Sequence, residues 1–589
     1  MNQDIKSTRP PITILYGSQT GTAEDLSHQV SQRLQRLQLK TNVSSIDDFH
    51  PDSIFSSTPT SCSYIIFIVS TTGQGVEPTN MKRFWKSLLQ KTLPFDLFEN
   101  VMSFTVFGLG DSSYPKFNWS SKKLYRRLLQ LGAHEFFKRG EADDQNTNGI
   151  DTTFTPWLDQ LCTTLLELIP LPPGLEVIPE TQLLPARYTL KPIQDPPSSF
   201  TDPSSDFSST FARLSKNERL TPDDHWQETR HLEFDFDERL EFLPGWVASV
   251  LPENSAEEVN QLLKLMKWEE IADELYELKS TIKGQSLPDS WNKPCTLREL
   301  FTTRFDFLSV PKKSFISWIS YFAQNQDQSE RLKEFCTIEA QDDLYDYINR
   351  PKRTILEVLQ DFKSVEIPLD YLHDIFPIIR PRQFSIASSP KIFPNQIHLL
   401  VAVVKYQTRI VKARKGLCTS WLSKLKPGYF TFSSVDPQSP VICIGPGTGI
   451  APFRSLIQHR SSEPQLQHPY QDLVFFGFRN LEKDCYYREE WMRYQTEGNC
   501  KVVLVASRDQ VEKKYVQHEI ENNSEEIWKM IFKDQASIFI SGSAGQMPKS
   551  VRKALRNVFE KEGKMKEDEV DGLIERLEKT GRLQEETWN

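Results

Sequence analysis

Hydrophobic residues in the first part of the chain fall into short unbroken runs, separated by longer stretches with a helical period. The runs are ITILY at 12–16, YIIFIV at 64–69 and SFTVF at 103–107. Such β-rich runs are typical of strands buried on both faces of a parallel sheet. Between the first two runs, the apolar residues on one helical face are Leu26, Val30, Leu34 and Leu37. This alternation predicts an open α/β domain over residues 11–167.

The same alternation returns near the end of the sequence, over residues 437–589. Its apolar runs are VICI at 441–444, LVFFG at 473–477, VVLVA at 502–506 and SIFIS at 537–541. We expect a second α/β domain there.

The chain between these two regions has a different texture. Residues 168–205 are rich in proline, which indicates a linker or a connection that follows the surface. Within 206–436, RHLEFDF (230–236) and IHLLVAVV (397–404) are strand-like, whereas much of 255–375 has a helical pattern. We expect an antiparallel barrel over 206–436 with a helical insertion at about 255–375.

Composition narrows the functional classes. The net charge of −9 argues against a nucleic-acid or anionic-membrane partner. No apolar run is long enough to span a bilayer, and the first residues lack the hydrophobic core of a signal peptide, so a soluble cytoplasmic protein is expected. The eight cysteines form no CxxC pair, and no metal site is predicted.

The first apolar run leads directly into GSQTGTAE (17–24) and a helix. Backbone N–H groups, hydroxyls and a helix N-terminus make such a loop suitable for an anion. Because the loop contains no lysine, it does not match the loop that binds nucleoside triphosphates. A neutral cradle suits a monophosphate, although a serine-rich turn is an equal alternative for this loop alone.

Two further loops, STTGQGVEP (70–78) and GLGDSSYPKFN (108–118), follow the next two runs. All three would lie at the carboxyl ends of parallel strands, where open α/β sheets bind ligands. Tyr114 could stack on a flat ring, and ADDQ (142–145) places acids at the rim. Together the loops resemble a flavodoxin-like domain that binds FMN. The resemblance implies FMN contacts from Ser18, Gln19, Thr20, Gly21, Thr22, Ala23, Ser70, Thr71, Thr72, Gly73, Phe107, Gly108, Leu109, Gly110, Asp111, Ser112, Ser113, Tyr114, Pro115, Lys116 and Asp143.

The middle region carries RQFSIASS (382–389) and GLCTSWL (416–422). Arg382 offers a fixed charge for a pyrophosphate. The second motif is expected to begin a helix, and its glycine and hydroxyl groups suit a second anion. Each motif alone reads as a surface arginine or an N-cap, but the pair resembles the FAD domain of ferredoxin–NADP reductases. The family pattern is Arg-x-Tyr-Ser, and here Phe384 replaces the tyrosine. The implied FAD contacts are Arg350, Arg382, Gln383, Phe384, Ser385, Gly416, Leu417, Cys418 and Thr419, together with Trp588 near the end of the chain.

The last region opens with VICIGPGTGIAPFRS (441–455), a strand, glycine-rich turn and helix. It is similar to the NADPH pyrophosphate loop of the same reductases. A 2′-phosphate needs cations and hydroxyl donors, and these follow the VVLVA run; each alone is more simply a solvated surface residue. The implied NADPH contacts are Thr448, Ser507, Arg508, Lys513, Lys514, Tyr515, Val516 and Gln517.

Two flavin motifs followed by a nicotinamide motif resemble a diflavin reductase over nearly the whole chain. The resemblance implies a flavodoxin-like FMN domain, an antiparallel β-barrel FAD domain with a helical insertion and a ferredoxin-reductase-type α/β NADP domain. It also implies that Trp588 covers the FAD ring until NADPH displaces it. Ser385 and Glu586 would be polar groups near the hydride path, where Ser541 replaces the usual cysteine.

TTGQG, GLGDSSY, RxFSIASS, GLCT and the ETW ending most resemble the NADPH-dependent diflavin oxidoreductase 1 family, called Tah18 in yeasts. The resemblance implies electron flow from NADPH through FAD and FMN to an iron–sulfur protein, anamorsin (Dre2 in yeasts), in cytosolic iron–sulfur protein assembly. The alternatives are a soluble reductase for a haem protein or for sulfite reductase, and a non-catalytic flavin-binding scaffold. A scaffold would not need the intact nicotinamide motifs.

Overall fold

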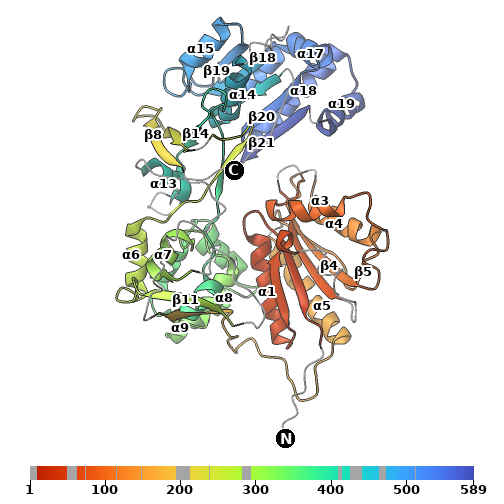
Figure 1. Cartoon of the computed structure of the whole chain (residues 1–589), viewed down its shortest axis with the longest axis vertical. Coiled ribbons are helices and arrows are strands. Elements are labelled where there is room, and N and C mark those ends of the chain that lie inside the picture. Colours follow the sequence, from red (N-terminus) through yellow and green to blue (C-terminus); the bar gives the residue numbers. More distant parts are fainter. Residues whose placement is uncertain are drawn as a thin grey trace. The chain divides into compact units, whose positions relative to one another are not determined.

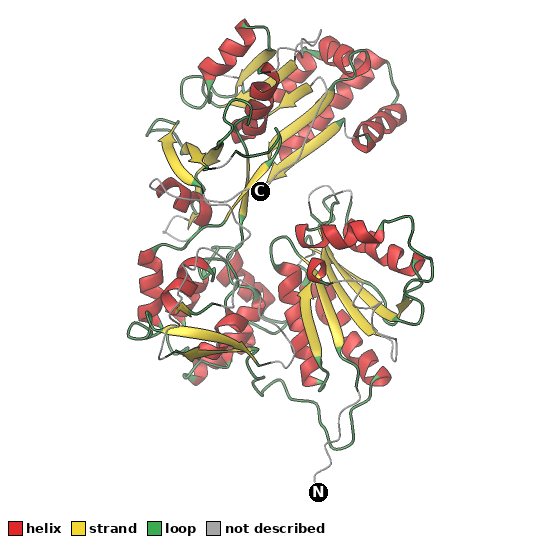
Figure 2. Cartoon of the chain, in the orientation of Figure 1, coloured by secondary structure: helices red, strands yellow, loops and turns green. Residues whose placement is uncertain are grey.

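The computed structural model describes residues 9–49, 63–72, 75–114, 116–146, 149–193, 212–237, 239–281, 293–408, 414–424, 441–462, 472–510, 512–580 and 582–588. The chain divides into two compact units. One unit consists of Met1–Gln194, Leu275–Pro294 and Ser309–Pro377, and the other of Asp195–Glu274, Cys295–Leu308 and Ile378–Asn589. Figure 1 follows the chain by colour and Figure 2 distinguishes helices from strands.

The first unit contains a parallel sheet with helices on both faces (Figure 2). Its strands are β1 (Ile12–Gly17), β2 (Thr41–Ser45), β3 (Ser63–Ser70), β4 (Met102–Gly110), β5 (His134–Glu135) and β6 (Gly140–Asp143). The order is β2-β1-β3-β4-β5, and β6 also pairs with β4. Helices α1 (Thr22–Arg36) and α5 (Asp151–Leu168) pack on one face, and α3 (Lys82–Leu88) and α4 (Trp119–Gln130) pack on the other. The predicted α/β class is therefore confirmed for this region.

The described part of the proline-rich stretch is ordered and hydrogen-bonded. Strand β7 (Tyr188–Pro192) pairs antiparallel with β11 (Leu275–Ser280). Before it, Arg36 at the end of α1 donates to the carbonyl oxygens of Pro179 (2.6 Å) and Gln182 (2.9 Å). The stretch therefore follows the surface of its own unit as far as residue 193.

Most of the helical insertion belongs to the same unit as the flavodoxin-like sheet. Its helices there are α8 (Lys313–Ser320), α9 (Gln326–Glu334), α10 (Gln341–Leu344), α11 (Ile355–Asp361) and α12 (Leu372–Ile375), with short helical turns at Tyr345–Asn349 and Leu369–Tyr371. Arg187, in the proline-rich stretch, joins the insertion to the parallel-sheet region. It forms an ion pair with Asp374 of the insertion and contacts both ring nitrogens of His28 in α1 at 2.7 and 3.1 Å.

The second unit begins with antiparallel strands, as the sequence predicts. Strands β8 (Arg213–Arg219), β9 (Thr229–Asp235) and β14 (Gln396–Ala402) form one sheet, and β10 (Val247–Val250) pairs with β13 (Arg382–Ser385). The bridge between Ile386 and Leu399 joins the two sheets. Helices α6 (Ala256–Leu265) and α7 (Leu297–Thr303) belong to this unit, as do the short strands β15 (Lys405–Tyr406) and β16 (Arg414–Lys415), which pair with each other before α13 (Leu417–Lys424).

The last region is a five-stranded parallel sheet, the second α/β domain that the sequence predicts. Its order is β19 (Cys500–Ala506), β18 (Asp472–Phe478), β17 (Val441–Ile444), β20 (Ser537–Ser543) and β21 (Leu583–Trp588). One face carries α14 (Ala451–Ser461) and α15 (Arg488–Thr496), and the other carries α16 (Val516–Asn522), α17 (Ser524–Phe532), α18 (Gln546–Gly563) and α19 (Glu567–Lys579). The strand β21 was not predicted, because LQEETW is polar and forms an edge.

No helix among the described residues is both long and apolar enough to cross a bilayer.

Candidate functional site

The first predicted loop connects β1 to α1 and is held by its own side chains. Ser18 is buried, and its Oγ accepts a hydrogen bond from the Gly21 N–H at 3.0 Å. Gly21 has a φ of 91°, a left-handed conformation that glycine adopts without strain. Gln19 accepts from the Thr79 N–H at 3.1 Å and from its hydroxyl at 2.9 Å, which fixes the outer side. The loop thus turns a helix N-terminus outward, as an anion site requires.

The second and third loops lie at the carboxyl ends of the neighbouring strands β3 and β4. Ser70 Oγ donates to the Gly17 carbonyl at 3.1 Å and joins the second loop to the first. Ser120 in α4 donates to the Val76 carbonyl at 2.8 Å. Tyr114 is 38% exposed, so its ring is available for stacking. Gly73 and Pro115, both predicted contacts, lie outside the described residues.

Two predicted contacts of the third loop have structural roles. The Phe107 side chain is fully buried against Trp157, with 4.8 Å between ring centroids, so only its backbone faces the site. Asp143 Oδ1 accepts from the N–H groups of Ser112 (2.9 Å) and Gln145 (3.0 Å). These bonds, with Ser112 dominant, lower the pKa of Asp143 and keep it ionised. Asp143 therefore positions the loop.

The two predicted FAD motifs lie in the second unit, on β13 and α13. Arg382 NH2 is 3.7 Å from Asp306 Oδ2, and 42% of its side chain is exposed. Thr419 Oγ1 accepts from the Val404 N–H at 2.9 Å, so this hydroxyl already stabilises the strand before the motif. Burial raises the pKa of Cys418 to about 12, which keeps its thiol protonated. Arg350 belongs to the other unit, where it forms a 2.9 Å ion pair with Asp346.

The C-terminal strand meets the FAD motif at a buried polar contact. Ser385 Oγ donates to Glu586 Oε1 at 3.2 Å, joining residues 201 positions apart. Burial raises the pKa of Glu586, and the Ser385 hydrogen bond only partly opposes this. Ser541, the register partner of Glu586 on β20, is buried, and its Oγ has no hydrogen-bond partner among the described residues. Ser385 and Glu586, which the sequence predicts as separate polar groups near the hydride path, thus contact each other directly. Trp588 ends β21, but its side chain lies outside the description.

The glycine-rich turn after β17 depends on close backbone packing. A Cβ on Gly449 would lie 2.1 Å from the Ser541 carbonyl oxygen, and one on Gly445 would lie 2.7 Å from the Gly449 carbonyl oxygen. Gly447 has a φ of 60°. The N–H groups of Gly445 and Gly449 bond to the carbonyls of Phe475 and Pro446, so the packing keeps the turn tight at the N-terminus of α14, where a pyrophosphate can approach the backbone closely.

We expect Gly449→Ala to destabilise this domain by about 1–3 kcal/mol, since the added methyl forces the backbone apart. It should also lower NADP+ affinity at least tenfold. Thermal unfolding and calorimetric titration with NADP+ measure the two effects. Gly572→Ala in α19 is the matched control, because a Cβ there meets nothing within 4 Å. Equal NADP+ affinity in both variants would refute the role of the turn.

The predicted clamp follows β19. Arg508 is exposed, and its guanidinium has no hydrogen bond or ion pair within the described part of the chain. Lys514 instead forms an ion pair with Glu519. Val516 is the buried first residue of α16, so its contact with a ligand would be through the backbone. The remaining predicted NADPH contacts are Ser507, Lys513, Tyr515 and Gln517. Of these, Ser507 is buried and Gln517 is half-buried.

Arg479, directly after the neighbouring strand β18, was not predicted as a site residue. Its carbonyl accepts the Arg508 N–H at 2.9 Å, and its guanidinium lies over the exposed ring of Trp226, 3.5 Å from the centroid. Burial lowers the pKa of Arg479, and the nearby Arg508 charge lowers it further. Two cations close enough to repel each other favour an anion between them. The signal was an arginine close behind a buried strand: Arg479 is the first residue after β18, and Arg508 is the second after β19.

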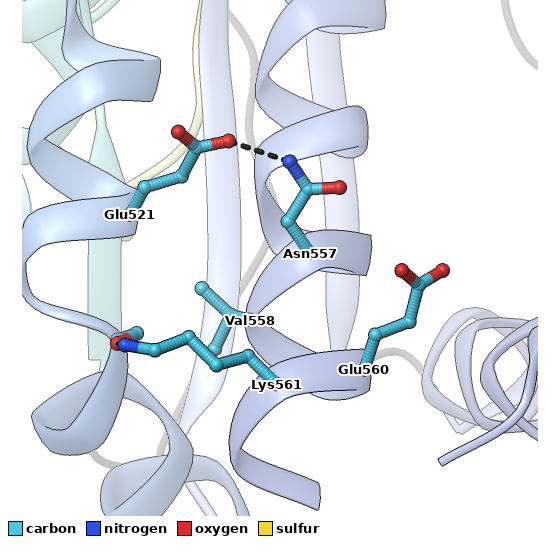
Figure 3. A pocket seen from close by; sticks show the side chains of 6 residues that line it. Glu521, Asn557, Val558, Glu560 and Lys561 are labelled. Atoms are coloured by element: carbon cyan, nitrogen blue, oxygen red, sulfur yellow. Dashed lines mark hydrogen bonds between the residues drawn. The ribbon is translucent and has the colours of Figure 1, made fainter. Parts of the chain in front are cut away.

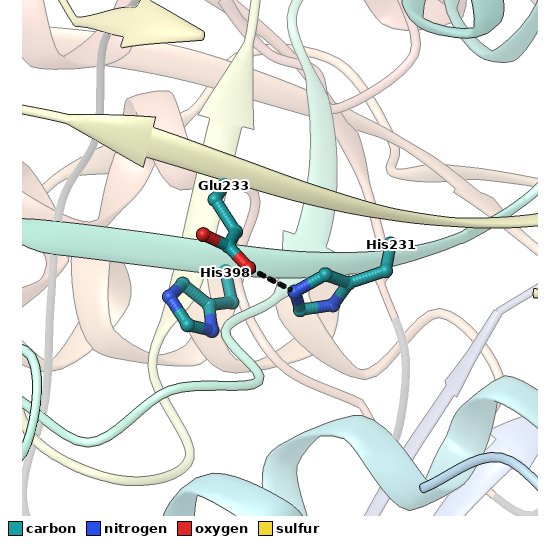
Figure 4. A group of neighbouring side chains, drawn as sticks. All are labelled: His231, Glu233 and His398. Carbon is teal, nitrogen blue, oxygen red and sulfur yellow. Dashed lines mark hydrogen bonds and ion pairs between the residues drawn. The ribbon is translucent and has the colours of Figure 1, made fainter. Parts of the chain in front are cut away.

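Buried polar contacts join the antiparallel strands to the last domain within the second unit. Figure 4 shows His231, Glu233 and His398; His231 also bonds to the Tyr487 hydroxyl at 2.9 Å. These three side chains could hold a metal ion by spacing, but the Arg454 guanidinium is 3.5 Å from His398 Nδ1 and disfavours a cation. Burial lowers the pKa of His398 to about 2, so it stays neutral. These side chains form a hydrogen-bond network that holds β9, β14 and α14 together.

A hollow of about 520 Å³ lies between α16, α17 and α18 (Figure 3). Its polar groups bond to each other: Asn557 donates to Glu521 at 2.6 Å, and Lys561 donates to Ser524 at 2.7 Å. Because these groups are already paired, the hollow presents no unsatisfied site for a ligand.

Comparison with known families matches the order of the three regions. The flavodoxin family matches residues 14–157, the FAD binding domain matches 203–421 and the oxidoreductase NAD-binding domain matches 443–553. These domains correspond to the cofactors FMN, FAD and NADPH predicted from the sequence. The parallel sheets of the structure agree with the first and last matches.

Several relatives are similar to this chain over nearly their full length. "NADPH-dependent diflavin oxidoreductase 1" of Danio rerio is 40% identical over 98% of this chain and 99% of its own length. Proteins of the same name from Schizosaccharomyces pombe (38% identical, 98% and 99% covered) and Emericella nidulans (37%, 98% and 96%) are also similar. The chain belongs to the NADPH-dependent diflavin oxidoreductase 1 family, and it is an NADPH-dependent oxidoreductase.

Proposed function

We propose that this enzyme passes electrons from NADPH, by way of FAD and FMN, to an iron–sulfur protein of the anamorsin (Dre2) type in cytosolic iron–sulfur protein assembly. The observation that carries the hydride-transfer part is the 3.2 Å contact between Ser385 and Glu586, which places the FAD motif beside the C-terminal strand. Bound flavins supply the chemistry that converts a two-electron hydride into single electrons.

The chain's own residues prepare the reaction. In this proposal Arg508, with Arg479 beside it, binds the 2′-phosphate, and the turn at 445–449 receives the pyrophosphate. Ser385 and Glu586, both partly buried, hold a proton close to the flavin ring. The buried network around His231 keeps both binding regions in one rigid unit, so the nicotinamide end is directed towards β13 and β21.

Delivery to a partner requires the flavodoxin-like domain to expose its loops. The three loops present Tyr114 and the neighbouring backbone at one edge of the sheet. We propose that the proline-rich stretch permits this domain to move between FAD and the acceptor. The hydrogen bonds from Arg36 to the proline-rich stretch must then break during each catalytic cycle.

Replacing Trp588 by alanine is expected to raise kcat/KM for NADH about fivefold. Stacking of an indole on a flavin contributes about 1 kcal/mol, which corresponds to that factor. NADPH, whose 2′-phosphate supplies extra binding energy, should gain less. Steady-state kinetics with both nucleotides and ferricyanide measures the ratio, and Trp588→Phe should behave as the wild type. An unchanged ratio would make Trp588 a packing residue.

The acceptor is tested directly by anaerobic spectroscopy. The purified enzyme and NADPH should reduce the cluster of an anamorsin-type protein within seconds at micromolar concentrations. A cytochrome P450 and the haem subunit of sulfite reductase serve as comparison acceptors at equal concentration. Faster reduction of a haem protein than of the cluster would overturn the proposed acceptor, while leaving the reductase activity in place.

A further inference from the structure

A lysine from the helical insertion contacts the candidate phosphate loop. Lys312 directly precedes α8, and its Nζ donates to the Gly21 carbonyl oxygen at 2.7 Å, across 291 positions of sequence. Gly21 is the residue before α1 and the turning point of the loop. A cation from a distant segment therefore lies beside the first turn of α1, against a carbonyl that also accepts the Asp25 N–H, within one compact unit.

Two neighbours of Lys312 support the same docking. Ser314 Oγ donates to Asp25 Oδ1 at 2.6 Å in the first turn of α1. Lys313 Nζ lies 3.7 Å from Asp151 Oδ2, at the first residue of α5. Three consecutive residues, 312–314, thus contact the N-terminal turns of the two helices on one face of the sheet. A fixed arrangement of this kind holds the Lys312 ammonium near the loop.

The loop itself lacks a countercharge. Ser18 to Ala23 contains only N–H groups and hydroxyls, and the first turn of α1 adds the acids Glu24 and Asp25. A phosphate dianion bound there would meet partial positive charge from the helix but full negative charge one turn later. Burial lowers the pKa of Lys312, and Asp25 opposes the shift only in part. An added anion would favour the charged ammonium, so the two sites are coupled electrostatically.

We propose that Lys312 is the countercharge for the FMN phosphate, supplied by the helical insertion, so that FMN binding and docking of residues 312–314 strengthen each other. The proposal depends on the placement of the FMN phosphate in the loop 18–23. By thermodynamic linkage, the free energy by which docking strengthens FMN binding equals the free energy by which FMN binding strengthens docking. The enzyme would then hold its FMN domain against the insertion more firmly when it carries its cofactor.

The test compares FMN with riboflavin, which has the same ring but no phosphate. Flavin-depleted full-length enzyme is titrated with each ligand by fluorescence quenching, at low and at physiological salt. We expect Lys312→Met to weaken FMN about tenfold and riboflavin less than twofold, and to reduce the salt dependence of FMN binding. Lys312→Arg should retain FMN affinity. Lys363→Met is the control, because it removes an exposed lysine of the same unit that lies outside 312–314.

A second measurement reports docking without catalysis. FMN should slow hydrogen exchange at 312–320 in the wild type, and this protection should be lost in Lys312→Met. Equal weakening of FMN and riboflavin would overturn the proposal and make Lys312 a structural contact. So would unchanged FMN affinity. Riboflavin binding shows in the same titration that the variant is folded. If Ser18→Ala and Thr22→Ala leave wild-type FMN affinity intact, the placement of the phosphate fails, and the countercharge fails with it.

Discussion

Arg508→Ala is expected to raise the KM for NADPH about 30- to 100-fold and to change the KM for NADH less than twofold. The guanidinium is exposed and unpaired within the described residues, so its whole hydrogen-bonding capacity is available to a ligand. A hydrogen bond to a charged group contributes up to about 3 kcal/mol, and about 2–2.7 kcal/mol corresponds to this range. NADH lacks the 2′-phosphate and loses nothing. Steady-state kinetics with a saturating acceptor gives both values.

The structure supplies a control for this prediction. Lys514 lies in the same loop but is paired with Glu519, so Lys514→Ala should raise the KM for NADPH only about two- to threefold. Arg479→Ala should resemble Arg508→Ala, because the Arg508 N–H donates to the Arg479 carbonyl and the charge of Arg508 helps to lower the pKa of Arg479. If NADPH and NADH suffer equally in Arg508→Ala, the residue does not bind the 2′-phosphate.

Much of this site could be predicted from local sequence because each loop directly follows a buried strand. The runs at 12–16, 64–69 and 441–444 became strands β1, β3 and β17, and their loops lie at the carboxyl ends of those strands. Parallel order and strand-end loops are consequences of alternating βα units. The FMN and NADPH motifs could therefore be found from residues close together in the chain, whereas the FAD motifs lie on the antiparallel strand β13 and on α13.

Other features depend on long-range packing, which a local pattern does not contain. Phe107 lies within β4, whose last residues reach the site, yet the sheet's pleat directs its ring into the core beside Trp157. The contacts of Lys312 and Arg479 join segments that are distant in sequence or lie on different strands. The strand β21 has no apolar run, because an edge strand needs only one partner and a polar exposed side. Such residues can be identified only once the fold is known.

Glu586→Gln is expected to slow flavin reduction by NADPH about 100-fold while raising the stability of the enzyme. The reduction in rate follows if the carboxyl holds a proton near the hydride path, since positioned acid–base groups contribute about 10²–10⁴-fold. The gain in stability follows from burial. Because burial raises the pKa of Glu586, the folded enzyme binds a proton that the unfolded chain has released once the pH exceeds about 4.5. Stability is therefore lost as pH rises from there to the folded-state pKa.

Glutamine keeps the hydrogen bond from Ser385 but cannot ionise, so the variant should lose this part of the pH dependence and unfold at a higher temperature at neutral pH. Stopped-flow absorbance measures flavin reduction, and thermal unfolding between pH 5 and 8 measures stability. Glu585→Gln is the neighbouring control: its carboxylate is buried and accepts from Arg552 at 2.8 Å. That variant should lose about 1–3 kcal/mol and keep most of its reduction rate. Stability changes of opposite sign in the two variants separate a functional carboxyl from a structural one. If Glu586→Gln is destabilised and still reduces its flavin at the normal rate, Glu586 has a structural role only.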